Sequence, residues 1–352
     1  MKLQFIFVIV AIFISAVNAN AQLSPTFKNV NYDDQYMGVE GFILGRTCYS
    51  LRATRLNLNC NPAFMAGEVE NKLNFNLNLD NNVTEVSGYI NELQDHESES
   101  IINRILDNPK PLVAYDLATS WWQYDWWAVA VTPARLAVAS AVTNPAYPIV
   151  SSHVSFQREV SMRGGVFVAE DLNFKIGANL RYVQNNQFRD EFALLDVISG
   201  TRKINVVENN IVYFEPAMTY SWHSAWESHV SLVLTHLRLY ESDRSVPDVA
   251  RPEIGYSTSP EYLNKKLRTS IHYTARPDVT RIGDRFRFGG IYEFSDLLSF
   301  SFSLAGDEYG LGVTGRYDSV VLGLGTKSEL FNLNGSDVGR VTTTLFQAGL
   351  TF

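Results

Sequence analysis

Three histidines, His223, His229 and His236, are the first candidates for chemistry, because imidazole is a common metal ligand. A metal site on a β-strand favours ligands two residues apart, which point to the same face, whereas these histidines are six and seven residues apart. No cysteine lies among them. The sequence therefore predicts no metal site, and it points to no other cofactor.

Two enzyme motifs were sought in the same way. The segment Gly310–Gly315 matches G-x-G-x-x-G by letter, but it lies in strand-like sequence with no helix after it, so we interpret it as a chance match. The chain has no G-x-S-x-G elbow, and no serine–histidine or aspartate–histidine pair stands out by its spacing. We therefore predict a protein that is not an enzyme.

The elements that would position any site are alternating strands, and the clearest spans Asn173 to Val183. Phe174, Ile176 and Leu180 share one parity, and the polar residues share the other. Alternation with a period of two places the two sets on opposite faces of a β-strand. Because the pattern recurs along the chain, it predicts an all-β protein, a transmembrane antiparallel β-barrel.

An export signal precedes this pattern. An apolar run from Phe5 to Val17 is followed by Ala19-Asn20-Ala21, which fits a small-x-small cleavage site, so residues 1–21 are interpreted as a cleaved signal peptide. A membrane-anchoring helix is the alternative, but the run is short for a span. The net charge of -8, without a basic block, argues against nucleic-acid binding.

Residues 22–67 do not alternate and are predicted to form a plug ahead of the first strand. The segment contains Asn61-Pro62-Ala63-Phe64, whose proline favours a turn. It also holds the two cysteines of the chain, Cys48 and Cys60. In an oxidising periplasm these form a disulfide that closes a small loop, and two buried thiols are the alternative.

The Asn-Pro-Ala turn, placed after a glycine-containing segment and before alternating strands, resembles the outer-membrane long-chain fatty acid transporter family (FadL-like). Val129–Pro133 and a second Asn144-Pro145-Ala146 look more like its conjugal-transfer TraF-like branch. The resemblance implies a barrel of about 14 strands with an N-terminal hatch in its lumen. It places Asn61, Pro62, Ala63 and Phe64 in the hatch and the transport path.

Residues 68–352 are predicted to form the barrel, with 14 to 16 strands. Helical spacing places an excursion at about 83–107, in the first long loop. Arg158-Glu159 and Glu170-Asp171 are interpreted as turns, and residues 184–208 as a polar loop. The strands least certain by sequence are Ala134–Val142 and one near Ile254.

The positions of the charged residues indicate which strand face lines the lumen. A lysine or arginine that faces lipid at the bilayer midplane destabilises a barrel by about 2–4 kcal/mol. The predicted lumen-facing charges are Lys175, Arg181, Arg285 and Arg287. Tryptophan prefers the membrane interface, and the predicted interface aromatics are Trp121, Trp122, Trp126 and Trp127. Predicted weak points for a sideways opening of the wall are Pro133, Gly164 and Gly165.

The final strand ends in Phe352, and a terminal aromatic residue is what the outer-membrane barrel assembly machinery typically recognises. The other expected partners are outer-membrane lipid and a hydrophobic small-molecule ligand. The favoured function is transport of hydrophobic or amphipathic molecules, such as long-chain fatty acids, across the bacterial outer membrane. One alternative is a non-transporting structural or assembly barrel of an envelope, secretion or conjugation apparatus. A second alternative is an outer-membrane lipid hydrolase.

Overall fold

The structure is a computed structural model. It describes residues 38–80, 112–143, 149–169, 173–193, 196, 206–222, 226–242, 250–275, 285–306, 308–333 and 336–352. The predictions for the signal peptide (1–21), the first part of the plug (22–37), the helical excursion (83–107) and His223 lie outside these residues.

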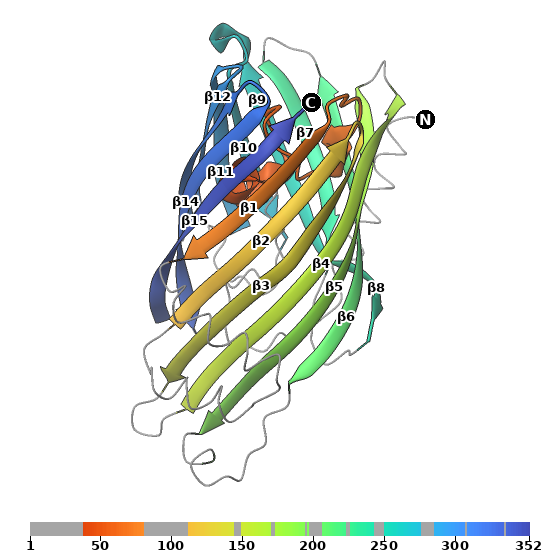
Figure 1. Ribbon diagram of the computed structural model, residues 1–352. Helices are drawn as coiled ribbons and strands as arrows, with labels where there is room; N and C mark the ends of the chain where they lie inside the picture. Colours follow the sequence, from red (N-terminus) through yellow and green to blue (C-terminus); the bar gives the residue numbers. More distant parts are fainter. Residues whose placement is uncertain are drawn as a thin grey trace.

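The described chain is mostly strand (Figure 1). The strands are β1 (Lys72–Asp80), β2 (Leu112–Tyr124), β3 (Trp127–Thr143), β4 (Ile149–Ala169), β5 (Phe174–Ala193), β6 (Val207–Trp222), β7 (Trp226–Thr235), β8 (Leu237–Glu241), β9 (Arg251–Pro260), β10 (Leu267–Thr274), β11 (Phe286–Ser295), β12 (Leu298–Leu304), β13 (Glu308–Tyr317), β14 (Val320–Leu333) and β15 (Ser336–Thr351). Both strands that were uncertain by sequence exist, within β3 and as β9.

The strands form one closed antiparallel barrel. Neighbours along the chain pair with one another, and β1 closes the ring by pairing with β15 from Lys72↔Thr351 to Asp80↔Thr343. β7 and β8 are one strand interrupted at His236, since β6 pairs with both. The described strands therefore make a 14-strand barrel, which confirms the predicted architecture.

The outer face of the barrel is apolar and the inner face is polar. On β1, Leu73 and Phe75 are 46% and 47% exposed, whereas the alternating residues Asn74 and Asn76 are 3% and 2% exposed. The same contrast recurs on the other strands, where exposed aromatic and aliphatic side chains alternate with buried polar ones. This is the pattern of a barrel that faces lipid outside and encloses polar groups.

The two ends of the barrel differ in their connections. At one end, tight turns at Asp125 and Asp318, both with positive φ, join β2 to β3 and β13 to β14. At the other end, β1 ends at Asp80 and β2 begins at Leu112. Short turns are typical of the periplasmic side of an outer-membrane barrel.

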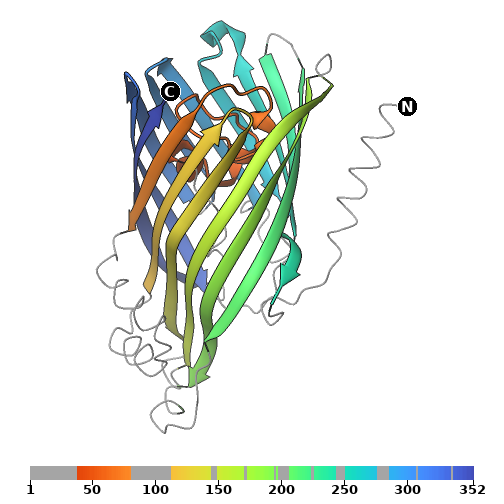
Figure 2. The ribbon, with the colours of Figure 1, turned by 45° about the vertical axis from the view of Figure 1, so that its right-hand side comes forward.

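The plug, here residues 38–70, lies inside the barrel toward the short-turn end (Figure 2). It contains α2 (Val39–Leu44) and the 3-10 helices η2 (Gly45–Tyr49) and η3 (Pro62–Met65). Cys48 and Cys60 form a disulfide, with their Cα atoms 5.6 Å apart. No helix of the described residues is long and apolar enough to cross a membrane.

Two predicted loops are wrong. β4 runs without a turn through Arg158 and Glu159, because Glu159 faces inward to the Arg181 guanidinium while Arg158 lies outside with its guanidinium 5.3 Å from the Phe156 ring centroid. The predicted loop 184–208 is also too long, since β5 continues to Ala193 and pairs with the start of β4. Hydrogen bonding between β4 and β5 holds these polar residues in a β-strand, although their composition alone suggests a loop.

The face assignment predicts a position-dependent cost for a charge. We expect Leu180→Arg, on the outer face of β5 and six residues after its start at the short-turn end, to lower the free energy of unfolding by about 2–4 kcal/mol. The matched Tyr317→Arg, at a short turn and 87% exposed, should cost about 0–1 kcal/mol. Urea unfolding in lipid vesicles measures both, and equal costs would contradict the assignment.

Candidate functional site

The candidate site is the boundary between the plug and the barrel wall, and its centre is the Asn-Pro-Ala turn. The Asn61 Oδ1 accepts a hydrogen bond from the Ala63 N–H at 2.9 Å, and its Nδ2 donates to the Tyr49 carbonyl at 2.8 Å. Pro62 opens η3, where its missing N–H and fixed φ suit a first helical position. The predicted hatch residues therefore form one capped, buried turn.

Two wall glycines, Gly165 on β4 and Gly177 on β5, receive this turn. They pair directly with each other, and we call them the glycine seat. A Cβ atom at Gly165 would lie 2.3 Å from the Pro62 carbonyl oxygen, and one at Gly177 would lie 2.4 Å from the Ala63 nitrogen. Only glycine permits so close an approach of two backbones.

A buried polar cluster ties the plug to β9 and β10. The Arg46 guanidinium lies 2.5 Å from the Glu253 carboxylate, whose other oxygen lies 2.7 Å from His272 Nε2 and accepts from the Thr274 hydroxyl at 2.6 Å. Arg46, Glu253 and His272 are each 2% exposed or less. A buried carboxylate needs such partners, because an unpaired charge is costly in a low-dielectric interior.

The same cluster includes a serine, and so has the residue types of a Ser-His-acid triad. The Ser50 Oγ lies 3.3 Å from His272 Nδ1 and 2.6 Å from the Ser270 hydroxyl. A Cβ atom at Gly255 would lie 2.2 Å from the Ser50 Cβ, so the serine is packed directly against the wall. Ser50 is fully buried between the plug and the wall, so its geometry is that of a docking contact.

The predicted lumen-facing charges occupy the interior at different heights. Arg181 lies between two carboxylates, 2.6 Å from Glu159 and 2.9 Å from Glu215, and is 3% exposed. Arg287 pairs with Glu308, which also binds the Lys327 ammonium at 3.0 Å. Each cation is therefore neutralised across strands, as burial requires.

The remaining two predicted cations lie nearer the edges of the site. The Lys175 ammonium donates to the Ala66 carbonyl of the plug at 3.2 Å and lies 4.6 Å from the Phe167 ring centroid. Arg285 directly precedes β11 and shares the parity of Arg287. The structure thus brings Lys175 and the hatch turn together, but it leaves Arg285 at the end of the wall.

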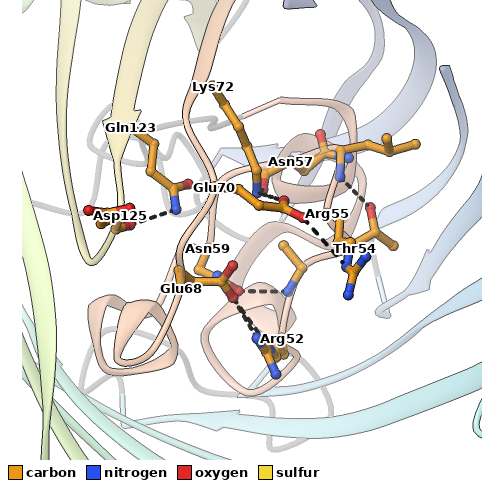
Figure 3. A network of polar contacts seen from close by, with 12 residues as sticks. Arg52, Thr54, Arg55, Asn57, Asn59, Glu68, Glu70, Lys72, Gln123 and Asp125 are labelled. Atoms are coloured by element: carbon orange, nitrogen blue, oxygen red, sulfur yellow. Dashed lines mark hydrogen bonds and ion pairs between the residues drawn. The ribbon is translucent and has the colours of Figure 1, made fainter. Parts of the chain in front are cut away.

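The link from the plug to β1 is folded back onto the plug by ion pairs (Figure 3). The Glu68 carboxylate lies 2.6 Å from Arg52, and the Glu70 carboxylate lies 3.6 Å from Arg55 and 3.5 Å from Lys72. Except for Lys72, which is buried, these groups are partly or fully exposed. The link is therefore held by contacts that water can replace.

A cavity of about 730 Å³ opens beside this link at the short-turn end. The plug contributes Arg52, Phe64 and Glu68 to its lining, and the wall contributes Phe167 and Lys175. On its rim, the Lys265 ammonium lies 3.0 Å from the Glu227 carboxylate, and this hydrogen-bonded partner raises the pKa of Lys265. The cavity combines aromatic surface with charges of both signs.

The tryptophan prediction needs one correction. Trp122 and Trp126 are 41% and 50% exposed on the outside near the β2–β3 turn, and Trp127 packs edge-on against Trp122 with ring centroids 5.2 Å apart. Trp121 instead faces inward, is 2% exposed and packs against the plug residues Leu58 and Met65. Consecutive strand residues point to opposite faces, so only one of the Trp121-Trp122 pair can meet lipid.

The predicted weak points also divide. Gly164 and Gly165 pair regularly with β5, so the wall is continuous there. Pro133 does lie at an irregularity, since the registers of β3 with both β2 and β4 shift around it. A further irregularity occurs where the β6–β7 strand pair meets His236, which has a φ of 60° and donates its N–H to Glu215 at 3.3 Å.

Nothing in the motif search singles out Glu159, Glu215, Glu253 or Arg46, because none belongs to a short motif. One sequence signal could have identified such residues, namely a glutamate within a strand of alternating apolar and polar residues. Glu215, for example, shares the parity of Ile211 and Tyr213 on β6, and this set faces inward. A carboxylate there must face the lumen and implies a cation nearby. His229 and His236 contact Ser221 and Tyr213, and the described residues contain no group suited to a metal ion.

The chain matches no protein-family model and no curated protein. Among solved structures it is similar to the CymD monoaromatic hydrocarbon channel, with a TM-score of 0.49, 8% identity and coverage of 91% of this chain and 98% of that chain. The P. putida toluene transporter TodX gives a TM-score of 0.40 at 8% identity, covering 83% and 91%. A Pseudomonas aeruginosa FadL homologue gives 0.41 at 11% identity, covering 94% and 99%.

At identities of 8–11% and TM-scores below 0.5, these likenesses assign no family, so the FadL-like resemblance and its TraF-like branch stay predictions from the sequence.

The glycine seat predicts a selective loss of plug docking. We expect Gly177→Leu to leave the barrel folded but to exclude the hatch turn, because a Cβ atom already overlaps Ala63. Trypsin should then cleave at Arg46, which is 2% exposed in the seated plug, in folded protein. Ala178→Leu is the matched control, since its side chain points outward, and cleavage equal to that of Gly177→Leu would contradict the seat.

The buried cluster predicts a large effect from one carboxylate. Glu253→Gln removes the negative charge that faces the buried Arg46 guanidinium and should destabilise plug docking by about 3–5 kcal/mol. Hydrogen exchange of residues 38–70, followed by mass spectrometry, measures the change. The double variant Arg46→Met with Glu253→Met should recover much of the protection. The exposed-pair control Arg55→Ala should cost about 0–1 kcal/mol, and a matching effect there would refute the ranking.

Proposed function

We propose that this protein is a plugged outer-membrane barrel that passes hydrophobic or amphipathic small molecules and that the plug is its gate. The observation that carries the proposal is the plug–wall boundary. A closed barrel surrounds a separate segment, residues 38–70, that continues into β1 and is seated against β4, β5, β9 and β10.

The contacts at this boundary suit a segment that moves. The Ser303 hydroxyl donates to the Ile43 carbonyl, Gln347 Oε1 accepts from the Val39 N–H, and Arg268 donates to the Arg52 carbonyl. The first two, between neutral groups, contribute about 0.5–1.5 kcal/mol net each, and the one from the charged Arg268 about 1.5–3 kcal/mol, because water replaces each bond when the partners separate. The plug is therefore held by many weak contacts and a few strong ones, which allows partial release.

Apolar surface at the same boundary supports an apolar cargo. Leu58 and Met65 of the plug pack against Trp121, Ala128 and Ala130 of the wall. A second inward-facing apolar cluster consists of Val183, Ile211 and Tyr213. Separation of the first cluster would expose apolar surface that a hydrophobic molecule could cover, at about 25 cal/mol per Å².

The proposed location is the outer membrane, reached after cleavage behind Ala21 and assembly through the strand that ends at Phe352. The outward apolar face and the short-turn end fit this orientation.

A non-transporting structural barrel is the second candidate. The observation that favours it is the number of buried ion pairs that fix the interior, such as Arg46–Glu253 and Arg181 between its two glutamates. Such a barrel would function with its plug permanently seated. Fixing the plug to the wall should therefore abolish the function of a gated transporter but not that of a structural barrel.

A plug cross-linked to the wall should lose transport. We expect Ser50→Cys with Ser270→Cys, whose parent hydroxyls lie 2.6 Å apart, to form a disulfide in a Cys48→Ser, Cys60→Ser background. Uptake of a long-chain fatty acid and an aromatic hydrocarbon, measured in a strain that lacks the native gene, should fall when the pair is oxidised and return on reduction. The background without the new pair is the control. Unchanged uptake in the locked state would refute gating, and uptake that never depended on the gene would refute transport.

A further inference from the structure

An apolar groove crosses the outer face of the wall where β4, β5 and β6 lie side by side. Its volume is about 570 Å³, within the range of about 300–1,000 Å³ typical of small-molecule sites. Its outward lining includes Met162, Val166, Leu180, Phe214 and Met218.

The groove exists because small residues lie in register between two rows of large ones. Gly164 pairs with Ala178, and Ala178 pairs with Pro216, so one row across three strands has almost no outward side chain. The flanking rows are Met162, Leu180, Phe214 on one side and Val166, Ile176, Met218 on the other, again in direct register. A depression therefore runs across the strands between two apolar ridges.

The indole of Trp126 closes the β3 end of this groove. A Cβ atom at Gly164 would lie 3.3 Å from the Trp126 ring and 3.2 Å from its carbonyl oxygen. Trp126 belongs to the β2–β3 turn and is 50% exposed. The groove consequently lies near the short-turn end of the barrel, where the ring of a tryptophan meets the membrane interface.

The floor of the groove is closed. The β4–β5 ladder is regular from Ile149 to Phe167, and the β5–β6 ladder is regular from Phe174 to Gln187. Behind the floor, the glycine seat is filled by the backbone of Pro62 and Ala63. An occupant must therefore enter from the membrane and not from the lumen.

We propose that this groove binds one acyl chain of a phospholipid in the leaflet at the short-turn end. The ridges are continuous with the lipid-facing surface, because Met162, Val166 and Leu180 are 54%, 48% and 49% exposed. Every outward side chain of the lining is apolar. The lining also includes Arg163, but this residue is 4% exposed and its guanidinium points inward, where it donates to the Asn59 and Cys60 carbonyls. The inference rests on the membrane location of the barrel and is independent of transport.

Photolabelling tests the site. Purified full-length protein is placed in phosphatidylethanolamine–phosphatidylglycerol vesicles that contain a phospholipid with a diazirine in its acyl chain, and labelled peptides are mapped by mass spectrometry. Label should be at least several-fold higher on Met162–Val166 and Ile176–Leu180 than on the exposed apolar face of β14 at Val320–Leu324. Equal labelling of these surfaces would overturn the proposal.

A filled groove provides the matched comparison. Ala178→Phe should remove most of the groove label, and Ala178→Leu, which adds less volume, serves if the larger residue prevents folding. Ala348→Phe, the same change on the outer face of β15, should leave the groove label unchanged. Loss of groove label with Ala348→Phe, or its persistence in both Ala178 variants, would overturn the site.

Competition identifies the occupant. Toluene or dodecanoate added to the wild type should leave the groove label within about twofold of its starting value. If either molecule abolishes it while label on Val320–Leu324 persists, the groove is a site for the cargo and the lipid proposal fails. This result would leave the proposed transport function standing, so the two failures are distinguishable.

Discussion

The requirement on which the rest of this structure depends is that every main-chain N–H and C=O inside a membrane finds a partner within the protein. Strands meet it only by closing into a ring. The pairing of β1 with β15 supplies that closure, because it joins the first and last strands of the chain over the whole of β1. Side-chain alternation then follows, since each residue of a closed wall must face either lipid or lumen.

Closure at 14 strands creates a second requirement, because an interior of this width cannot be filled by wall side chains alone. The plug fills part of it, and polar residues on the inner face must find partners on the plug or on neighbouring strands. Arg181 is satisfied by Glu159 and Glu215, each on a strand adjacent to its own. Glu253 is satisfied by Arg46 of the plug and His272 of β10. The interior is therefore stabilised by paired charges as well as by apolar packing.

The sequence predicted well what is local and poorly what is not. Period-two alternation identifies a strand without reference to its partner, which is why the barrel and the orientation of Lys175, Arg181 and Arg287 could be inferred. The predicted loop at 184–208 was too long. Pairing with β4 holds the end of β5 in strand conformation, and the polar composition of this segment does not reveal that pairing. The Arg46–Glu253 contact joins residues 207 positions apart, and the Pro62–Gly165 contact joins plug and wall; neither has a signature in one sequence.

Gly164 and Gly165 illustrate how one local feature can be interpreted in two ways. Glycine within a strand weakens packing, which favours a hinge or an opening, but it also permits close approach. The regular pairing on both sides of β5 removes the first interpretation at this place, and the contact of Gly165 with the hatch turn supports the second. Because neighbouring strand residues face opposite sides, a run of small residues across β4, β5 and β6 thins the wall to little more than backbone. The inner hollow is filled by the plug, and the outer hollow has only the membrane to fill it, which makes an acyl chain its natural occupant.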